Sequence, residues 1–483
     1  MRHIRPEINN MKRYVFLLLI GAAFFAAGCT MIPKYHRPEA PVPDKWPSGP
    51  AYKQAPQKAR AVTEIPWRQF FTDERIQTVI ASALENNRDL RVAALNVERA
   101  RALYRIQRVE LLPTIDASAS GSRERKPAAL SDGGSPKTSD LYRADLGISY
   151  WEIDFFGRIR SLEKSALEQY FATEQARRSA QILLVSEVAN AYLTLAADRE
   201  DLQLAQSTLA TQQAVHRLIK RRFDTGISSE LDLRQAQTQV DAARVDVAFY
   251  RQLAARDKNA LDLLVGSSVP ADLLPEALSS VTPLPDVSPG TTSEALLSRP
   301  DILQAENLLK AANANIGAAR AAFFPRIALT TSVGTVSNDL SGLFDSGTGA
   351  WNYGAQLVMP IFDARTLPAL KASKVDKEIA VAQYEKAIQS AFREVADALA
   401  QRGTIEDQMN AQQSLVDATF ASYQLANARY TKGIDTYLNA LVAQRALYVS
   451  QQGLISTRLS KLANQVRLYE VLGGGGDSET RKD

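Results

Sequence analysis

Two kinds of hydrophobic pattern alternate along this chain. In four short stretches, apolar and polar residues alternate with a period of two, and these stretches begin near Ile115, Tyr142, Ile327 and Trp351. Each is about 9–11 residues long, which is the length that a tilted membrane-spanning strand needs. Long proline-free stretches with helical spacing lie between them. The pattern therefore predicts four strands, each with one apolar and one polar face, separated by long helices.

The four strands pair as two predicted hairpins. Their loops, roughly Arg123–Asp140 and Ser337–Ala350, are rich in Gly, Ser and Asp, as the outer loops of membrane barrels are. The aromatic residues on the apolar faces would suit an interfacial girdle. They are Tyr142, Tyr150, Trp351 and Tyr353. A soluble antiparallel sheet gives the same alternation, but four strands in lipid would leave open edges, so a membrane barrel would need several copies of the chain.

The predicted helices are unusually long. From Gly157 to Asp224 there is no proline and no interior glycine, which at 1.5 Å per residue is a length on the order of 100 Å. The stretch from Ala369 to Lys432 is interrupted only by Gly403. Apolar residues recur every seven positions in the helices that follow, which predicts left-handed supercoiling against a neighbour. They are Leu233, Val240, Val247, Ala254 and Leu261, then Leu441, Tyr448, Ile455, Leu462 and Tyr469.

The two halves of the chain repeat the same plan. Pro113 follows Asp89 by 24 positions, and Pro325 follows Asp301 by 24 positions. A second pair of similar segments closes the long helices at 222–227 and 429–434. Each half reads helix, strand, loop, strand, very long helix, turn and long helix, so we expect two internal structural repeats.

These boundaries predict six segments. They are a signal peptide at 1–28, a proline-rich arm at 29–65, a first repeat at 66–270 (strand hairpin 114–153, helical hairpin 157–265), a linker at 271–298, a second repeat at 299–472 (strand hairpin 326–360, helical hairpin 364–470) and a disordered tail at 473–483.

The N-terminus has the features of an export signal followed by a lipid attachment site. Lys12 and Arg13 precede an apolar run, and Met11 is an alternative start to Met1. The run ends in Ala-Ala-Gly before Cys29, the only cysteine, which resembles a bacterial lipobox with Ala26 in the usual leucine position. In that motif the thiol takes a diacylglycerol and the new N-terminus an acyl chain. The alternative is a free thiol behind an ordinary signal peptide.

Composition excludes several other classes of protein. Residues 1–28 carry four basic and one acidic residue, and the remainder has 53 basic and 52 acidic residues. This near balance lacks the excess of positive charge that is typical of nucleic-acid-binding proteins. No run of about 18 apolar residues follows the N-terminus, so no later helix is expected to span a membrane. Three histidines, one cysteine and no phosphate-binding glycine motif predict no enzyme, no metal site and no cofactor.

With these features, the chain resembles the TolC-type outer membrane factors, and among them the OprM-like lipoproteins of the NodT family. The resemblance runs nearly end to end and depends on many short segments in a fixed order. They are Cys29 with Pro33, Tyr35, Arg37 and Pro38; Trp67 with Phe70, Phe71 and Asp73; and the segments 87–90, 151–157, 223–226, 231–234, 299–301, 360–363 and 468–475.

The resemblance implies an α+β membrane protein that works as a homotrimer. Three copies would form a 12-stranded barrel in the outer membrane of a Gram-negative bacterium, continued by a periplasmic barrel of coiled helices. Its partners would be a periplasmic adaptor protein and a proton-driven inner-membrane pump. The expected function is a passive, gated exit duct for drugs or other small toxic compounds. Alternatives are a duct for type I protein secretion, a duct for heavy-metal efflux, and a lipoprotein scaffold without a pore.

The resemblance also points to a gate and to partner contacts at the helix tips. Leu438 falls where the family has a hydrophobic constriction, and Arg445 matches an arginine near that aperture. Val442 stands where an acidic residue is common, so an acidic ring at that level is in doubt. Leu438 as a core residue and Arg445 as a surface arginine are the alternatives. The turns that would meet the adaptor contain Gly226 and Ile227, and Gly433 and Ile434.

Overall fold

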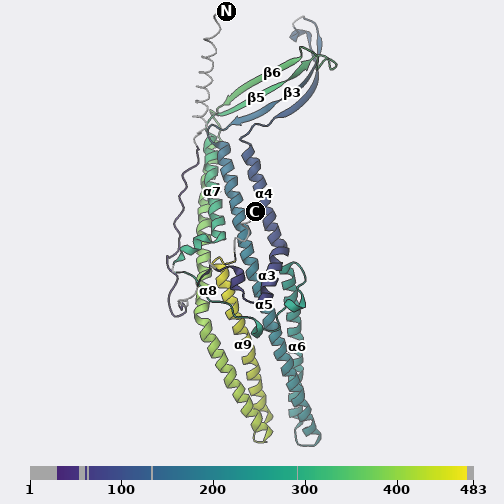
Figure 1. Ribbon diagram of the computed structural model, residues 1–483, viewed down its shortest axis with the longest axis vertical. Helices are drawn as coiled ribbons and strands as arrows, with labels where there is room; N and C mark the ends of the chain where they lie inside the picture. The colour runs from purple at the N-terminus through teal and green to yellow at the C-terminus, as the bar shows by residue number, and fades with distance from the viewer. Residues whose placement is uncertain (1–29, 54–59, 63–64, 132–133, 291, 476–483) are drawn as a thin grey trace, which may run out of the picture. The chain divides into compact units, whose positions relative to one another are not determined.

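The computed structural model describes residues 30–53, 60–62, 65–131, 134–290 and 292–475 (Figure 1). Its α-helices are α2 (Trp67–Phe70), α3 (Glu74–Asn86), α4 (Arg88–Val109), α5 (Arg158–Asp224), α6 (Glu230–Val265), α7 (Pro300–Ala321), α8 (Thr366–Thr431) and α9 (Tyr437–Val471). Its strands are β1 (Arg60–Ala61), β2 (Asp116–Lys126), β3 (Lys137–Ile153), β4 (Val287–Ser288), β5 (Arg326–Ser337) and β6 (Gly349–Val358). Short 3-10 helices are η2 (Ala128–Leu130), η3 (Ala271–Leu273), η4 (Leu278–Ser280) and η5 (Ser293–Ser298).

The chain divides into two compact units, and each draws on both halves of the sequence. The first unit contains the described residues of Met1–Pro38, Val97–Ala172 and Ala305–Tyr384. The second contains those of Glu39–Asn96, Thr173–Gln304 and Glu385–Asp483. Compact packing therefore does not follow the two sequence halves, because the long helices carry each half from one unit into the other.

The long helices form where the sequence predicts them. α5 has 67 residues and α8 has 66, while α6 and α9 have 36 and 35. The isolated Gly403 within α8 has a packing reason, since a Cβ there would collide with the backbone carbonyl of Ala51 in the N-terminal arm. Glycine at this position lets the arm cross the helix in close contact.

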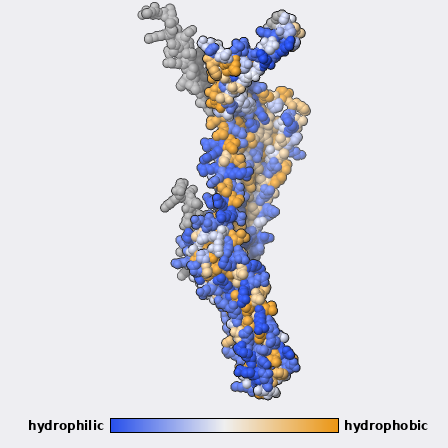
Figure 2. All heavy atoms as spheres, turned by 90° about the vertical axis from the view of Figure 1, so that its right-hand side faces the viewer, coloured by the Kyte–Doolittle hydropathy of each residue, from blue (hydrophilic) through white to orange (hydrophobic). Residues whose placement is uncertain are grey.

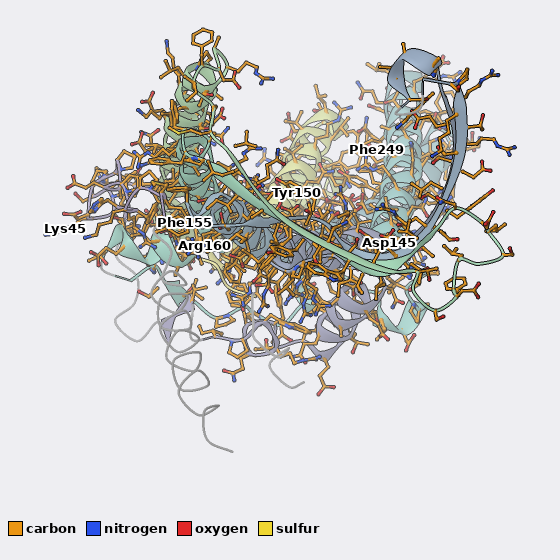
Figure 3. All side chains as sticks on the ribbon, turned by 90° about the horizontal axis from the view of Figure 1, so that it is seen from above. Lys45, Asp145, Tyr150, Phe155, Arg160 and Phe249 are labelled. Atoms are coloured by element: carbon orange, nitrogen blue, oxygen red, sulfur yellow. The ribbon has the colours of Figure 1, made fainter. Side chains whose placement is uncertain are left out.

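The sheet of the first unit has four antiparallel strands in the order β2-β3-β5-β6. Its register places Leu146 opposite Val333, and Val333 opposite Trp351, on one face. The other face is polar, with Asp145 opposite Ser118, and Figure 3 shows Asp145 on this sheet from above. The predicted separation of an apolar and a polar face is confirmed. Tyr150 falls in a bulge between Ile148 and Trp151, so the register does not assign its side.

The first predicted loop was too long. β2 continues to Lys126 and β3 starts at Lys137, so much of the predicted loop Arg123–Asp140 is strand. Arg123, Glu124 and Arg125 are polar on both faces, which hid the strand from a pattern based on alternation. The second predicted loop, Ser337–Ala350, matches the gap between β5 and β6 closely.

No covering layer from the described residues lies on the apolar face of the sheet. Trp351 is 73% exposed, Tyr353 is 74% exposed and Leu357 is 63% exposed. The outer edges of β2 and β6 pair with no other described strand. Such a sheet is incomplete by itself, because edges and apolar faces of this size are normally paired or covered.

The N-terminal arm binds to helix α7 in the first unit through a buried charge. Arg37 donates two hydrogen bonds to Glu306, at 3.0 and 2.6 Å, and Lys310 lies 3.2 Å from the same carboxylate. Glu306 is 3% exposed, and these cations hold its pKa below the usual range despite burial. The arm is therefore an ordered part of the fold between residues 30 and 53.

The second unit has an aromatic centre near the end of α9. The rings of Phe70 and Tyr469 stack at 4.1 Å, and the Tyr469 hydroxyl donates to the Ile65 carbonyl at 2.7 Å. The predicted disordered tail starts too early. Gly474 packs so tightly on Tyr469 that a Cβ would collide with the ring, and Gln181 donates to the Gly475 carbonyl at 3.2 Å. Residues 476–483 and the signal peptide lie outside the described residues.

One segment of α5 is long and apolar enough, by length and composition, to cross a membrane. However, 61% of that segment is buried inside the structure, as in the core helix of a folded domain. The expectation that no later helix spans a membrane therefore stays a prediction.

Candidate functional site

The two turns that end the long helices have the same backbone conformation. Gly226 has a φ of +74° and Gly433 a φ of +72°. The Ile227 amide donates to the Arg222 carbonyl at 2.8 Å, and the Ile434 amide donates to the Arg429 carbonyl at 3.0 Å. These bonds close a helix end around a left-handed residue, for which glycine carries no Cβ penalty. The left-handed conformation suggested by the sequence is thus present in both turns.

Both turns present an isoleucine to the surroundings. Ile227 is 71% exposed and Ile434 is 61% exposed. They follow Gly226 and Gly433 directly, so the predicted contact residues protrude from the chain rather than pack into it. Their role as adaptor contacts stays a prediction.

The acidic residues beside the turns are used for capping. Ser229 and Asp232 form a reciprocal capping box at the start of α6. Asp435 accepts hydrogen bonds from the Thr436 amide at 2.8 Å and from Asn439 at 2.6 Å. These bonds and Arg429 lower the pKa of Asp435. Its carboxylate is therefore engaged in its own turn.

Above the turns, four helices meet in a small hydrophobic cluster. Its buried members are Ile219, Ala236, Tyr437 and Leu441, and Val215, Leu233 and Tyr430 pack against them. Leu438 lies outside the cluster and is 51% exposed. Within this chain Tyr437 and Leu441 occupy the core positions beside Leu438. Whether Leu438 acts as a gate residue or packs in the core of the tip coil stays a prediction.

The predicted gate residues lie on one face of α9. Leu438, Val442 and Val449 are 51%, 59% and 65% exposed, and Arg445 between them is also exposed. Their spacing of four, three and four residues forms one stripe along the helix. Leu441 and Ile455 of the heptad are buried on another face. The structure thus brings Leu438, Val442 and Arg445 together on a surface that the chain does not use for its own core.

Two side chains tie α9 to α6 near this stripe. Arg445 donates to the amide oxygen of Gln239 at 3.0 Å, and Gln452 donates to the Tyr250 hydroxyl at 2.7 Å. The partner of Arg445 is therefore a neutral amide on α6. That the face bearing this stripe lines a channel stays a prediction from the family resemblance.

A group of carboxyls between α5 and α6 was missed from the sequence. Asp257 on α6 is 7% exposed, and Arg256 donates to it at 3.3 Å. Burial and the neighbouring Asp257 carboxyl raise the pKa of Asp198 on α5 to about 7. Burial and Glu200 raise the pKa of Asp201 to about 6. Sequence pattern gave no signal, because each of these aspartates falls in a polar stretch of its helix.

A chain with two long helical hairpins and a four-stranded sheet matches a known family. The family model described as "Outer membrane efflux protein" matches residues 79–267 and 291–474. The chain belongs to the outer membrane efflux protein family.

Relatives of this family agree over nearly the full length. A protein of Pseudomonas putida named "Probable efflux pump outer membrane protein TtgC" is 50% identical over 465 residues, covering 96% of each chain. A solved membrane protein of Pseudomonas aeruginosa is 40% identical with a TM-score of 0.86, covering 92% of this chain and 100% of its own. The open-state MtrE outer membrane channel of Neisseria gonorrhoeae is 36% identical with a TM-score of 0.83, covering 94% and 100%.

The family establishes what the protein does at a coarse level. It is an outer-membrane channel protein that serves as the exit duct of an efflux system. Such a duct is a transport component rather than an enzyme. Within the described residues, no group of three or more His, Cys, Asp or Glu side chains is placed to hold a metal ion.

The first prediction separates gating from folding at the tip. Leu438→Ala and Leu438→Glu should raise the closed-state conductance in planar bilayers and leave thermal unfolding nearly unchanged, because Leu438 is exposed in the chain. Leu441→Ala is the matched control, since it removes a buried side chain and should cost about 2–4 kcal/mol of stability. Wild-type closed conductance in both Leu438 variants would refute the gate assignment.

The second prediction concerns pH. Between about pH 4 and pH 7 the folded protein keeps a proton on Asp198 that the unfolded chain has lost, so stability falls as pH rises through this window. The variant Asp198→Asn has no carboxyl to ionise at this position. It should therefore unfold at a higher temperature than wild type at pH 8 but not at pH 4. Because solvent screens a half-buried group, we expect a difference of about 1–2 kcal/mol.

The control for this experiment is Asp241→Asn. Asp241 is an exposed aspartate of α6 that pairs with Arg244 at 3.0 Å. Because Asp241 is exposed, its replacement should not stabilise the protein at pH 8 as Asp198→Asn does. Parallel pH profiles for Asp198→Asn and wild type would show that the pKa of Asp198 is not raised in the folded state.

Proposed function

We propose that three copies of this chain assemble into a passive, gated duct for drugs, solvents or other small toxic compounds. The observation that carries the proposal is the incomplete sheet. Its four strands leave β2 and β6 as edges, and its apolar face is exposed. Three such sheets joined edge to edge would give 12 strands, within the range of membrane barrels.

The helical part supports the same assembly. The two halves have the same order of elements, with α4 and α7 both of 22 residues, so we propose that they are structural repeats. Apolar side chains remain on the surface of the long helices, among them Val245 at 68% and Leu425 at 67% exposure. Figure 2 shows hydrophobic patches, in orange, among the hydrophilic surface of the helices. Neighbouring copies would cover it and enclose a tunnel.

In this assembly the stripe of Leu438, Val442 and Arg445 would face the bore at the periplasmic end. Three valines at the level of Val442 would make a drier constriction than an acidic ring. Asp435 does not replace that ring, because its carboxylate is bound within its own turn. Gly226, Ile227, Gly433 and Ile434 would meet a periplasmic adaptor, which joins the duct to a proton-driven inner-membrane pump.

Efflux is favoured over type I protein secretion and over a heavy-metal duct. The Pseudomonas putida relative is named for an efflux pump, and another from the same species is named for toluene efflux. These names describe the relatives, and they support small apolar compounds as the cargo of this duct.

The third prediction tests closure between copies. Ser120→Cys on β2 should form a disulfide with a cysteine on β6 of a neighbouring copy when combined with Asn352→Cys, Gly354→Cys or Gln356→Cys. All four positions lie on the polar face. Within one chain β3 and β5 separate these strands by about 14 Å, too far for a disulfide. Non-reducing electrophoresis should show a covalent trimer for at least one pair.

The single variant Ser120→Cys is the control and should stay uncross-linked. Native mass spectrometry of wild type should give three chains, and planar bilayers should show conductance. A wild-type protein that remains a monomer, with no cross-link in any pair, would contradict the assembly.

The fourth prediction concerns the N-terminus. We propose that Cys29, which lies outside the described residues, carries a diacylglycerol and an N-acyl chain. Its position after Ala-Ala-Gly and its status as the only cysteine support this proposal. Intact mass spectrometry of the mature protein should show the acyl mass in wild type and its loss in Cys29→Ser. A wild-type protein without acyl mass would refute the proposal.

A further inference from the structure

A cavity of about 800 Å³ lies in the second unit and belongs to neither the tip nor the sheet. It opens to the surface and is lined by α8, by α9, by Lys53 of the N-terminal arm and by the segment 278–286, which lies between the two sequence halves. Pockets of this size take small organic molecules. Nothing in the proposed gate or barrel uses it.

One wall of the cavity is apolar. Leu278, Leu284 and Ile405 are 3%, 8% and 5% exposed, and Met409 and Leu462 complete the wall. An apolar ligand that covered this wall would gain about 25 cal/mol for each Å² removed from water. The wall therefore favours a ligand with an apolar body.

The remaining lining is polar and carries more basic than acidic side chains. Four basic side chains line the cavity and only two carboxylates, Asp286 and Glu406, do so. The basic residues are Lys53, Arg402, Arg458 and Lys461. Lys461 pairs with Glu406 at 2.7 Å, and Lys53 pairs with Asp407 at 2.6 Å. The excess of positive charge is thus concentrated at the two arginines.

Arg402 is the cation with the least compensation. It donates to the Val287 carbonyl at 3.0 Å and to the Lys53 carbonyl at 3.4 Å. Among the described residues, no carboxylate lies within ion-pair distance of it. Burial lowers the pKa of Arg402, and the more distant Asp286 carboxylate offsets only part of that effect. Arg458, by contrast, has Glu200 at 3.6 Å. A half-buried guanidinium without an acidic partner is costly, and a bound anion would offset that cost.

We propose that this cavity binds an amphipathic organic anion, with its acidic group on Arg402 and its apolar body on the wall of Leu278, Ile405 and Met409. A planar guanidinium matches a carboxylate, sulfonate or phosphate group through paired hydrogen bonds. The bound molecule would bridge the segment 278–286 to α8 and α9. The inference does not depend on the proposed gate, because binding is measured without transport.

The fifth prediction uses 2-naphthoate as the probe, with full-length protein in lipid nanodiscs and isothermal titration calorimetry. The neutral analogue 2-naphthylmethanol and the cation 2-naphthylmethylammonium should bind at least about ten-fold more weakly, as expected for loss of a charge-assisted hydrogen bond. Arg402→Gln should weaken 2-naphthoate by a similar factor and leave the neutral alcohol unchanged. Arg393→Gln, an arginine of α8 that is 76% exposed, is the matched control and should bind as wild type does.

A second variant keeps the test decisive if Arg402→Gln fails to assemble. Met409→Trp adds an indole ring to the apolar part of the lining and removes neither carbonyl partner of Arg402, so it should weaken 2-naphthoate binding by obstructing the place of its apolar body. Bilayer conductance of each variant verifies an intact channel. Equal affinity for the anion and the alcohol, wild-type binding in Arg402→Gln or Met409→Trp, or no binding of 2-naphthoate at millimolar concentration would each overturn the proposal.

Discussion

Backbone hydrogen bonding at the edges of the sheet is the constraint on which the rest of the structure depends. β2 and β6 each present one row of peptide groups that no other described strand pairs. In hydrocarbon, such groups cannot turn to water for a partner, and each would cost several kcal/mol. The exposed Trp351 and Tyr353 make a hydrocarbon setting favourable for the face of this same sheet. The apolar face therefore favours contact with hydrocarbon, whereas the unpaired strand edges disfavour it. Association of several copies would pair the edges and still leave the apolar face to the hydrocarbon.

Much of this architecture could be predicted from the sequence because its periodicities are strong. The absence of proline over 157–224 corresponds to a single helix, α5, and period-two alternation identified four strands and their apolar face. Prediction failed in segments where residues of one chemical kind follow one another. Arg123 to Arg125 continue a strand without alternation, and the glycines after Leu472 looked flexible although they pack on Tyr469.

The candidate site was predictable only in part. Gly226 and Gly433 could be placed because a left-handed helix end favours one residue type, and both have that conformation. The exposure of Leu438 beside the buried Leu441 could not be read from the heptad alone, since either could occupy the core. The carboxyls of Asp198 and Asp257 come from the two consecutive helices α5 and α6, and the residues are 59 positions apart in sequence. Their meeting depends on helix register, which polar residues in polar stretches do not specify.

The binding of the N-terminal arm has a consequence for where a lipid could sit. Arg320, in the last turn of α7, donates to the Met31 carbonyl at 3.3 Å, and Asn313 donates to the Pro33 carbonyl at 2.8 Å. Two residues of chain reach at most about 7 Å, so the acyl group that we propose for Cys29 would be joined to this bound segment by a very short tether. A tether this short would hold the membrane surface close to the end of α7. The lipid would thereby set how deep the first unit lies in the membrane.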